Sequence, residues 1–121
     1  MKVVYENQVK GIGCLVDEFK DGDMFILFGD NAPDEIKDYC YQVSVNPING
    51  TIAAGQILKI DDLEFPITSV GWEAPHTLAG LGHCTVKFSG DKEPEVPGTI
   101  YVGPASVPEI TVGTVIQIIE N

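Results

Sequence analysis

The sequence predicts an all-β protein: a small barrel in a single domain, closed or partly closed, with about seven to nine short strands and one or two short helical turns. Short segments in which apolar and polar residues alternate recur along the 121 residues, and this period of two is typical of half-buried strands. Clusters of Gly, Pro, Asn and Asp separate these segments at intervals of about 8–12 residues. Almost no stretch shows the 3.6-residue period of an amphipathic helix.

The first three segments contain two predicted strands and one ambiguous stretch. Residues 1–8 alternate around Val3 and Tyr5 and predict a strand. Residues 14–22 fit either a strand or a short helical turn, and a tight turn is expected to follow at residues 20–23. Residues 24–28 form a continuous apolar run between turn residues, which predicts a strand buried on both faces.

The next segments predict a short helix and another strand. Pro33 is followed by two acidic residues, which is the pattern of a helix start, and the spacing allows only one or two turns. Residues 40–45 then alternate, with Tyr41, Val43 and Val45 on one face. Asn46 and Pro47 end this strand, and an Asn-Gly pair follows shortly afterwards.

The second half predicts a hairpin and three further strands. Residues 55–60 and 63–70 flank an Asp-Asp pair, and Pro66 indicates an edge position or a bulge in the second strand. Residues 71–82 are expected to be a loop with one helical turn. A strand is predicted over residues 84–88, where apolar and polar residues alternate again, and the last predicted strands cover residues 99–102 and 113–119.

Composition limits the classes of function. The formal charge is −11, and all seven basic residues are lysines, which argues against nucleic acid or an anionic membrane as a partner. No apolar run is long enough to span a membrane, and the N-terminal residues lack the apolar region of a signal peptide. Three cysteines without CxxC spacing suit free thiols in a reducing compartment. We therefore expect a cytoplasmic protein with one domain over residues 1–121.

His83 is the main candidate for a reactive side chain. It opens the predicted strand 84–88, so its imidazole is expected on the polar side with Thr85 and Lys87. A neutral imidazole is a nucleophile near neutral pH, and Thr85 could hydrogen-bond one ring nitrogen and leave the other free to attack. The alternative is a solvated surface histidine, which is the more frequent role of an exposed histidine at a strand end.

Other chemistries receive less support from the residues. Cys84 cannot pair with His83 as a nucleophile, because adjacent strand residues point to opposite faces. A metal site from Glu73, His76, His83 and a distant thiol stays open, although the spacing matches no zinc motif. Trp72 is expected to pack in the core or a loop rather than to stack on a sugar. No glycine pattern for binding phosphate is present, and we expect neither a metal nor a cofactor.

Five blocks along the chain resemble those of a known family. They are Tyr39-Cys40, Pro66-Ile67-Thr68-Ser69-Val70-Gly71, Leu81-Gly82-His83, Pro97-Gly98-Thr99-Ile100 and Gly113-Thr114-Val115. In this order they resemble the glucitol/sorbitol-specific IIA component of the bacterial phosphoenolpyruvate-dependent sugar phosphotransferase system. The resemblance extends from Tyr5 to the last predicted strand.

The resemblance implies a cytoplasmic phosphocarrier with a fold like a β-barrel. Such a phosphotransferase accepts a phosphoryl group from phospho-HPr on a histidine and passes it to the IIB domain, which phosphorylates the incoming sorbitol. His83 matches the Leu-Gly-His block and is thereby implied as the acceptor. Because Thr85 and Lys87 are expected on the same face as His83, Thr85 could orient the imidazole and Lys87 could stabilise the phosphoryl oxygens. The implied partners are HPr and the IIB and IIC components of a permease. The protein is expected to meet the membrane only through this permease.

The sequence departs from the family at Val43. Some members carry a histidine at this position, shortly after the Tyr-Cys pair, and that histidine has been proposed as the phosphorylated residue. Valine cannot accept a phosphoryl group. Two alternatives follow: either this position is not the acceptor in general, or the chain keeps the fold as a regulatory or binding module that has lost phosphotransfer.

Overall fold

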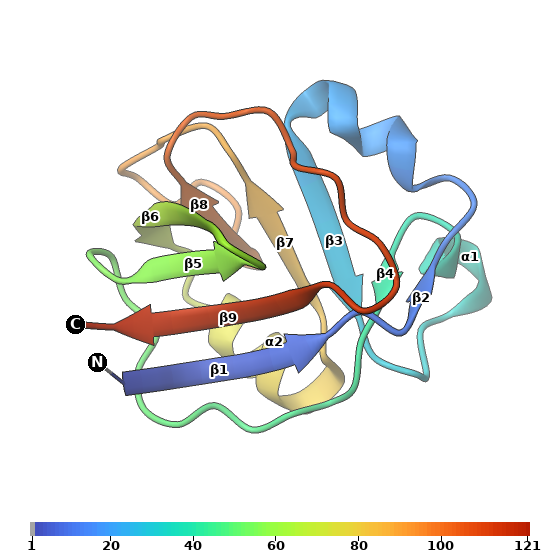
Figure 1. The fold of residues 1–121 in the computed structure, drawn as a ribbon, viewed down its shortest axis with the longest axis horizontal. Coiled ribbons are helices and arrows are strands. Elements are labelled where there is room, and N and C mark those ends of the chain that lie inside the picture. The colour runs from blue at the N-terminus through green and yellow to red at the C-terminus, as the bar shows by residue number, and fades with distance from the viewer. Residues whose placement is uncertain (1) are drawn as a thin grey trace.

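The computed structural model describes residues 2–121 and consists mainly of β-strands (Figure 1). Nine strands form one mixed sheet in the order β1-β9-β5-β6-β8-β7-β3-β4-β2. The strands are β1 (Lys2–Gln8), β2 (Gly11–Ile12), β3 (Met24–Phe28), β4 (Tyr41–Gln42), β5 (Ile57–Ile60), β6 (Leu63–Val70), β7 (Cys84–Lys87), β8 (Thr99–Val102) and β9 (Val115–Glu120). Three helices complete the fold: the 3₁₀ helix η1 (Val16–Gly22), α1 (Asp34–Lys37) and α2 (Ala74–Leu81).

The mostly-β architecture is confirmed, but the sheet does not close into a barrel. β1 and β2 are the two ends of the strand order and do not pair with each other. The first strand was predicted to begin at residue 1, which lies outside the described residues, and its described part is a strand. The predicted alternation around Val3 and Tyr5 is wrong, because the register shifts between these two residues, so that Val4 is buried with Tyr5 and Val3 is exposed. After β1 the chain turns away, and β2 pairs with β4 instead of with β1. No ladder therefore joins the two ends of the sheet.

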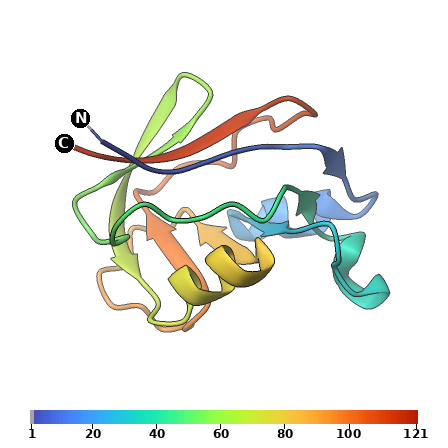
Figure 2. The same cartoon turned by 90° about the horizontal axis from the view of Figure 1, so that it is seen from below.

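The segment 43–50 lies along β1 and links the two ends of the sheet (Figures 1 and 2). The buried side chain of Asn7 bonds both the N–H and the carbonyl of Ser44, at 3.2 and 2.6 Å. Further along, the Asn46 amide donates to the Glu6 carbonyl at 2.8 Å, and the Asn49 N–H donates to the Val4 carbonyl at 2.7 Å. Side chains and single backbone bonds thus replace a regular ladder here.

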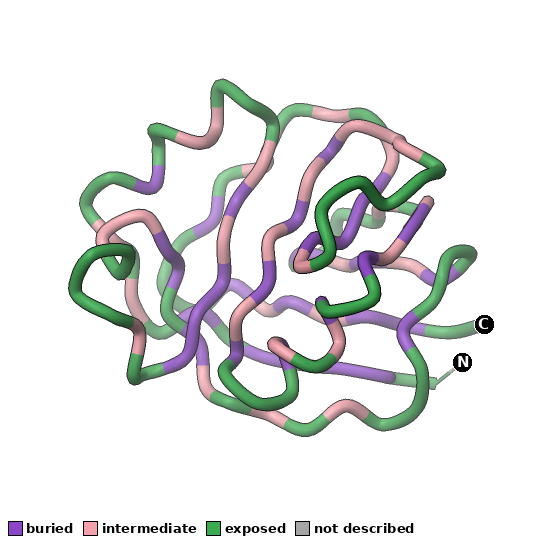
Figure 3. The backbone as a smooth tube through the Cα atoms, turned by 180° about the vertical axis from the view of Figure 1, so that it is seen from behind, coloured by how far each residue is buried: buried purple, intermediate pink, exposed green. Residues whose placement is uncertain are grey.

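Alternating burial along the strands builds the apolar core (Figure 3). In β7, Cys84 and Val86 are buried, while Thr85 and Lys87 are half-buried on the other face, as the sequence predicts. In β3 the same alternation holds, because Met24 and Ile26 are only half-buried. The expectation that residues 24–28 are buried on both faces is therefore wrong at those two positions.

Three local expectations change in the structure. Residues 71–82 contain the eight-residue helix α2 rather than one turn in a loop. The ambiguous stretch 14–22 forms the 3₁₀ helix η1, and only residues 41–42 of the predicted strand 40–45 have strand structure. Pro66 was expected to mark an edge position or a bulge. β6 lies inside the sheet, between β5 and β8, and its register with β8 shifts between Ile67 and Ser69, so the irregularity is observed and the edge position is not.

The three cysteines are free thiols in different environments. Cys14 is exposed, whereas Cys40 and Cys84 are buried. Burial raises the pKa of Cys84 to about 12 and that of Cys40 to about 11, because the thiolate would lose its hydration. At pH 8 we expect Ellman's reagent to label one thiol in the folded protein and three in denaturant. Fast labelling of two or more thiols in the folded state would contradict this burial.

Candidate functional site

His83 stands at the junction between α2 and β7. Pro75 occupies the first turn of α2, where a missing N–H costs nothing, and Gly82 ends the helix in the left-handed conformation with φ of 68°. The Gly82 N–H donates to the Leu78 carbonyl at 3.0 Å, and the His83 N–H donates to the Thr77 carbonyl at 3.1 Å. This helix ending fixes the direction in which the imidazole leaves the backbone.

Gly82 is required for two reasons, and replacing it tests the junction. Its positive φ disfavours any other residue, and an added Cβ would lie 2.9 Å from the Gly29 N. We expect Gly82→Ala to lower the free energy of unfolding by roughly 1–3 kcal/mol, measured by urea denaturation. Gly98→Ala is the control, since nothing lies within 4 Å of its added Cβ. Equal stability of the two variants would show that the junction tolerates a side chain.

Phe28 is the cross-strand neighbour of His83. Leu27 pairs with Cys84 in the antiparallel β3–β7 ladder, so the next pair places Phe28 opposite His83 on the outer face. The two rings lie 4.4 Å apart between centroids, with 37° between their planes. Phe28 is 6% exposed and His83 is half-buried. One face of the imidazole is therefore held against an apolar ring.

A single hydrogen bond orients the imidazole. His83 Nδ1 lies 3.3 Å from the carbonyl oxygen of Leu27. Because a carbonyl oxygen only accepts, this contact favours the tautomer that carries the proton on Nδ1. The lone pair of neutral His83 is then on Nε2, the atom that remains available for a nucleophilic attack.

The structure places Thr85 and Lys87 on the expected face but does not bring them to the ring. The hydrogen bond of the His83 ring goes to the Leu27 carbonyl, where the sequence analysis expected Thr85. Thr85 lies opposite Ile26, and Lys87 lies opposite Met24, farther along the strand. Four residues of strand separate the backbones of His83 and Lys87 by about 13 Å.

The other sequence candidates lie elsewhere or have other environments. His76 is exposed on α2, and within residues 2–121 no group of three or more His, Cys, Asp or Glu side chains is arranged to hold a metal ion. Trp72 is 71% exposed, so the expectation that it packs in the core or a loop is wrong. It lies just before α2, between the buried residues Gly71 and Ala74, with its own side chain in solvent.

Val43 belongs to the apolar core. Its side chain is 0% exposed, and its N–H donates to the Phe28 carbonyl at 2.9 Å. Position 43 is therefore a backbone neighbour of the residue that contacts His83. Its side chain, however, is buried with the core, while the rings of Phe28 and His83 lie on the outer face.

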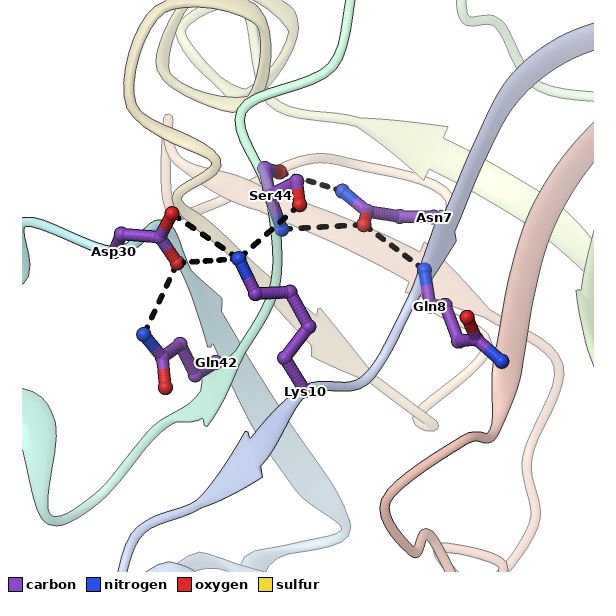
Figure 4. Close-up of polar contacts among 6 residues, drawn as sticks. All are labelled: Asn7, Gln8, Lys10, Asp30, Gln42 and Ser44. Atoms are coloured by element: carbon purple, nitrogen blue, oxygen red, sulfur yellow. Dashed lines mark hydrogen bonds and ion pairs between the residues drawn. The ribbon is translucent and has the colours of Figure 1, made fainter.

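A surface cavity of about 410 Å³ is lined by Phe28, the residue whose ring contacts His83. Its lining includes Phe28, Gly29, Asp30, Asp38 and Gln42. Lys10 Nζ lies 2.8 Å from the Asp30 carboxylate and 3.3 Å from the Ser44 hydroxyl, and the Gln42 amide donates to Asp30 at 3.0 Å (Figure 4). The hydrogen bond from Lys10 lowers the pKa of Asp30.

Sequence reasoning missed this cavity and the Lys10–Asp30 pair. Lys10 follows β1, and Asp30 follows β3, so only the strand order brings them together. The glycines at 11 and 13 were the one local signal. Gly13 lets the chain approach closely, because an added Cβ would lie 2.2 Å from the Asp38 carbonyl oxygen. Neither glycine belongs to a phosphate-binding motif.

Comparison with known proteins identifies the family. The family model described as "PTS system glucitol/sorbitol-specific IIA component" matches residues 4–117. The chain belongs to this family. It is 30% identical over 117 residues to the PTS system glucitol/sorbitol-specific EIIA components of Shigella flexneri and Escherichia coli (strain K12), covering 97% of this chain and 95% of each relative.

The fold of this glucitol/sorbitol-type IIA protein also matches a solved structure. The crystal structure of a PTS system IIA component from Enterococcus faecalis V583 aligns with a TM-score of 0.79 and 31% sequence identity. The alignment covers 93% of this chain and 97% of the other. Among residues 2–121, no helix is long and apolar enough to cross a membrane.

Proposed function

We propose that this protein is a phosphocarrier that accepts a phosphoryl group on Nε2 of His83. The donor is the phosphohistidine of HPr, and the recipient is a IIB domain. In the accepting step, the bond from phosphorus to the donor imidazole breaks as the bond to Nε2 forms. The observation that supports this assignment best is the 3.3 Å contact between Nδ1 and the Leu27 carbonyl, which leaves Nε2 free.

The surroundings of the imidazole suit this reaction. Phosphoryl transfer has a loose transition state, so the protein contributes mainly by aligning the two imidazoles. The Phe28 ring and the Leu27 carbonyl restrict the rotation of His83 from two directions, which reduces the entropy lost in alignment. Thr85 and Lys87 remain the side chains of this strand that could act on the phosphoryl group, through water or after a rearrangement.

Family membership supplies the other parts of the proposal. The sugar is sorbitol, also called glucitol, and the phosphoryl group reaches it through the IIB and IIC components of a permease. The protein acts in the cytoplasm and meets the membrane only through that permease. Its charge of −11 would speed the encounter with a donor that presents a basic surface.

A second function is supported by Val43. If the acceptor of the family is the histidine found at this position in other members, this chain cannot be phosphorylated there, because a buried valine replaces it. The protein would then be a regulatory or binding module that keeps the fold without phosphotransfer. This alternative predicts that the protein binds a partner but takes up no phosphoryl group.

Phosphorylation of the purified protein tests the proposal. The protein is incubated with radiolabelled phosphoenolpyruvate, enzyme I and HPr, and the product is analysed by its stability to acid and base. We expect an adduct that is labile in acid and stable in base, as is typical of a phosphohistidine. If no label is transferred while HPr itself is labelled, the phosphocarrier function is excluded and the binding module is favoured.

A further inference from the structure

The sequence around His83 is free of formal charge, although the protein carries 18 acidic residues. No Asp, Glu or Lys occurs in residues 39–58 or in residues 74–86. The structure brings parts of these two stretches together, since the segment 43–50 runs beside α2 (Figure 2). We call residues 43–50 and 74–83 the neutral face.

Gly29 joins the two halves of the neutral face. Its N–H donates to the Leu81 carbonyl at 2.9 Å, and a Cβ added to Gly29 would lie 2.8 Å from Val45 Cγ2. A Cβ added to Gly82 would similarly lie 3.4 Å from the Ser44 carbonyl oxygen. The end of α2, residues 44–45 and the Phe28–Gly29 backbone therefore meet beside the imidazole.

Two exposed apolar side chains lie at this meeting point. Val45 is 46% exposed and Leu81 is 42% exposed. Ionised side chains reach the neutral face from other elements. Asp30 lies next to Gly29, Glu73 precedes the first turn of α2, and Lys10 Nζ lies 3.3 Å from the Ser44 hydroxyl. An apolar, uncharged centre with charges at its edge is the composition of protein–protein interfaces.

We propose that the neutral face is the docking surface for the phosphorylated donor HPr, with Val45 and Leu81 as its apolar contacts. This inference rests on the proposed function in one respect: attack by Nε2 requires the phosphorus atom carried by the donor imidazole to lie within about 3–3.5 Å of Nε2, so the donor must cover the surface around His83. The matching donor surface has an apolar centre and a cationic group at its edge that faces Glu73, since Lys10 already pairs with Asp30.

Binding of unphosphorylated HPr tests the docking surface without depending on transfer. Leu81→Glu and Val45→Glu place a carboxylate at the centre of the neutral face, and calorimetric titration with HPr is expected to show Kd raised about tenfold or more. Leu63→Glu and Val112→Glu are the controls. These residues are 52% and 63% exposed, and Leu63 starts β6 at the β5–β6 turn, which lies opposite α2 in Figure 2. Control values of Kd should stay within about twofold of wild type.

The outcomes separate this inference from the proposed function. If Leu81→Glu and Val45→Glu weaken the binding of HPr and the controls do not, the docking surface is supported, even if wild type takes up no phosphoryl group. Unchanged binding in both variants, equal weakening in the controls, or no binding of HPr by wild type overturns it. Self-association of wild type that Leu81→Glu abolishes, without HPr binding, would assign the face to a second copy instead. Thermal melting checks that each variant is folded, and Leu81→Ala replaces Leu81→Glu if it is not.

Discussion

Replacing His83 by alanine is expected to abolish phosphorylation from phospho-HPr, while His76→Ala is labelled like wild type. His83 holds its ring between Phe28 and the Leu27 carbonyl with Nε2 free. His76 is exposed in the first part of α2 and has no such support. The measurement is the amount of acid-labile label per protein with radiolabelled phosphoenolpyruvate, enzyme I and HPr. Since these are the two histidines of the chain, each variant is the matched control of the other.

The reverse result would remove the assignment of His83. Label that persists in His83→Ala and disappears in His76→Ala would move the acceptor to α2. The thermal melting curve of His83→Ala shows whether this variant is folded. An absence of label in both variants can be interpreted only if both variants are folded. In wild type, the position of the phosphoryl group gives a finer check. Nuclear magnetic resonance should place it on Nε2, because Nδ1 faces the Leu27 carbonyl.

The face on which His83 lies could be predicted from sequence, but its neighbours could not. The alternation of Cys84, Val86 and Phe88 with polar residues is a local property, and the structure shows the same alternation of burial. The contacts with Phe28 and Leu27 depend on the pairing of β3 with β7. These strands are more than 50 residues apart in sequence, and no local pattern fixes which strands pair or in which register.

The length of helix α2 was underestimated, because the sequence of residues 74–81 carries only weak signals for a helix. Of its eight residues, only Ala74 and Leu78 are buried, so the apolar stripe that marks a helix is short. Pro75 and Gly80 are usually found in loops, although a proline fits the first turn of a helix. The sheet was predicted as a barrel from the number of short strands, the spacing of the turn signals, the near absence of helical periodicity and the family resemblance. Closure depends on pairing between the first and last strands of the order, and here the chain places the segment 43–50 along β1 instead.

Replacing Asn7 by leucine is expected to destabilise the protein by about 3 kcal/mol. Asn7 is 4% exposed, and its amide nitrogen donates to the Tyr5 hydroxyl at 2.7 Å and to the Ser44 carbonyl at 2.6 Å. Its oxygen accepts from the backbone N–H groups of Gln8 and Ser44 at 2.9 and 3.2 Å. Leucine keeps a similar volume but leaves these polar groups without partners in a buried place. Urea denaturation measures the change in the free energy of unfolding.

Asn46→Leu is the matched control for this substitution. Asn46 bonds the carbonyl of Glu6 from the same segment, but its bond is exposed, so water can replace the lost partner. We expect a loss of at most about 1 kcal/mol. Similar losses in the two variants would show that Asn7 does not hold the segment 43–50 to β1. Because Val45 lies in this segment, Asn7→Leu should also weaken the binding of HPr, whereas Asn46→Leu should affect it less.

Asn7→Asp tests whether the donor atoms, rather than the shape, stabilise this contact. The substitution replaces an NH₂ group that faces the Tyr5 hydroxyl and the Ser44 carbonyl with an oxygen. Burial beside a carbonyl oxygen would raise the pKa of this carboxyl above its unfolded value of about 3.9. A carboxyl whose pKa is raised in the folded state binds its proton more tightly there than in the unfolded state. The free energy of unfolding therefore falls as the pH increases through the folded pKa. We therefore expect the deficit of Asn7→Asp relative to wild type to be larger at pH 7 than at pH 4. A deficit independent of pH would show that the carboxylate escapes to solvent and that the segment 43–50 is not held through Asn7.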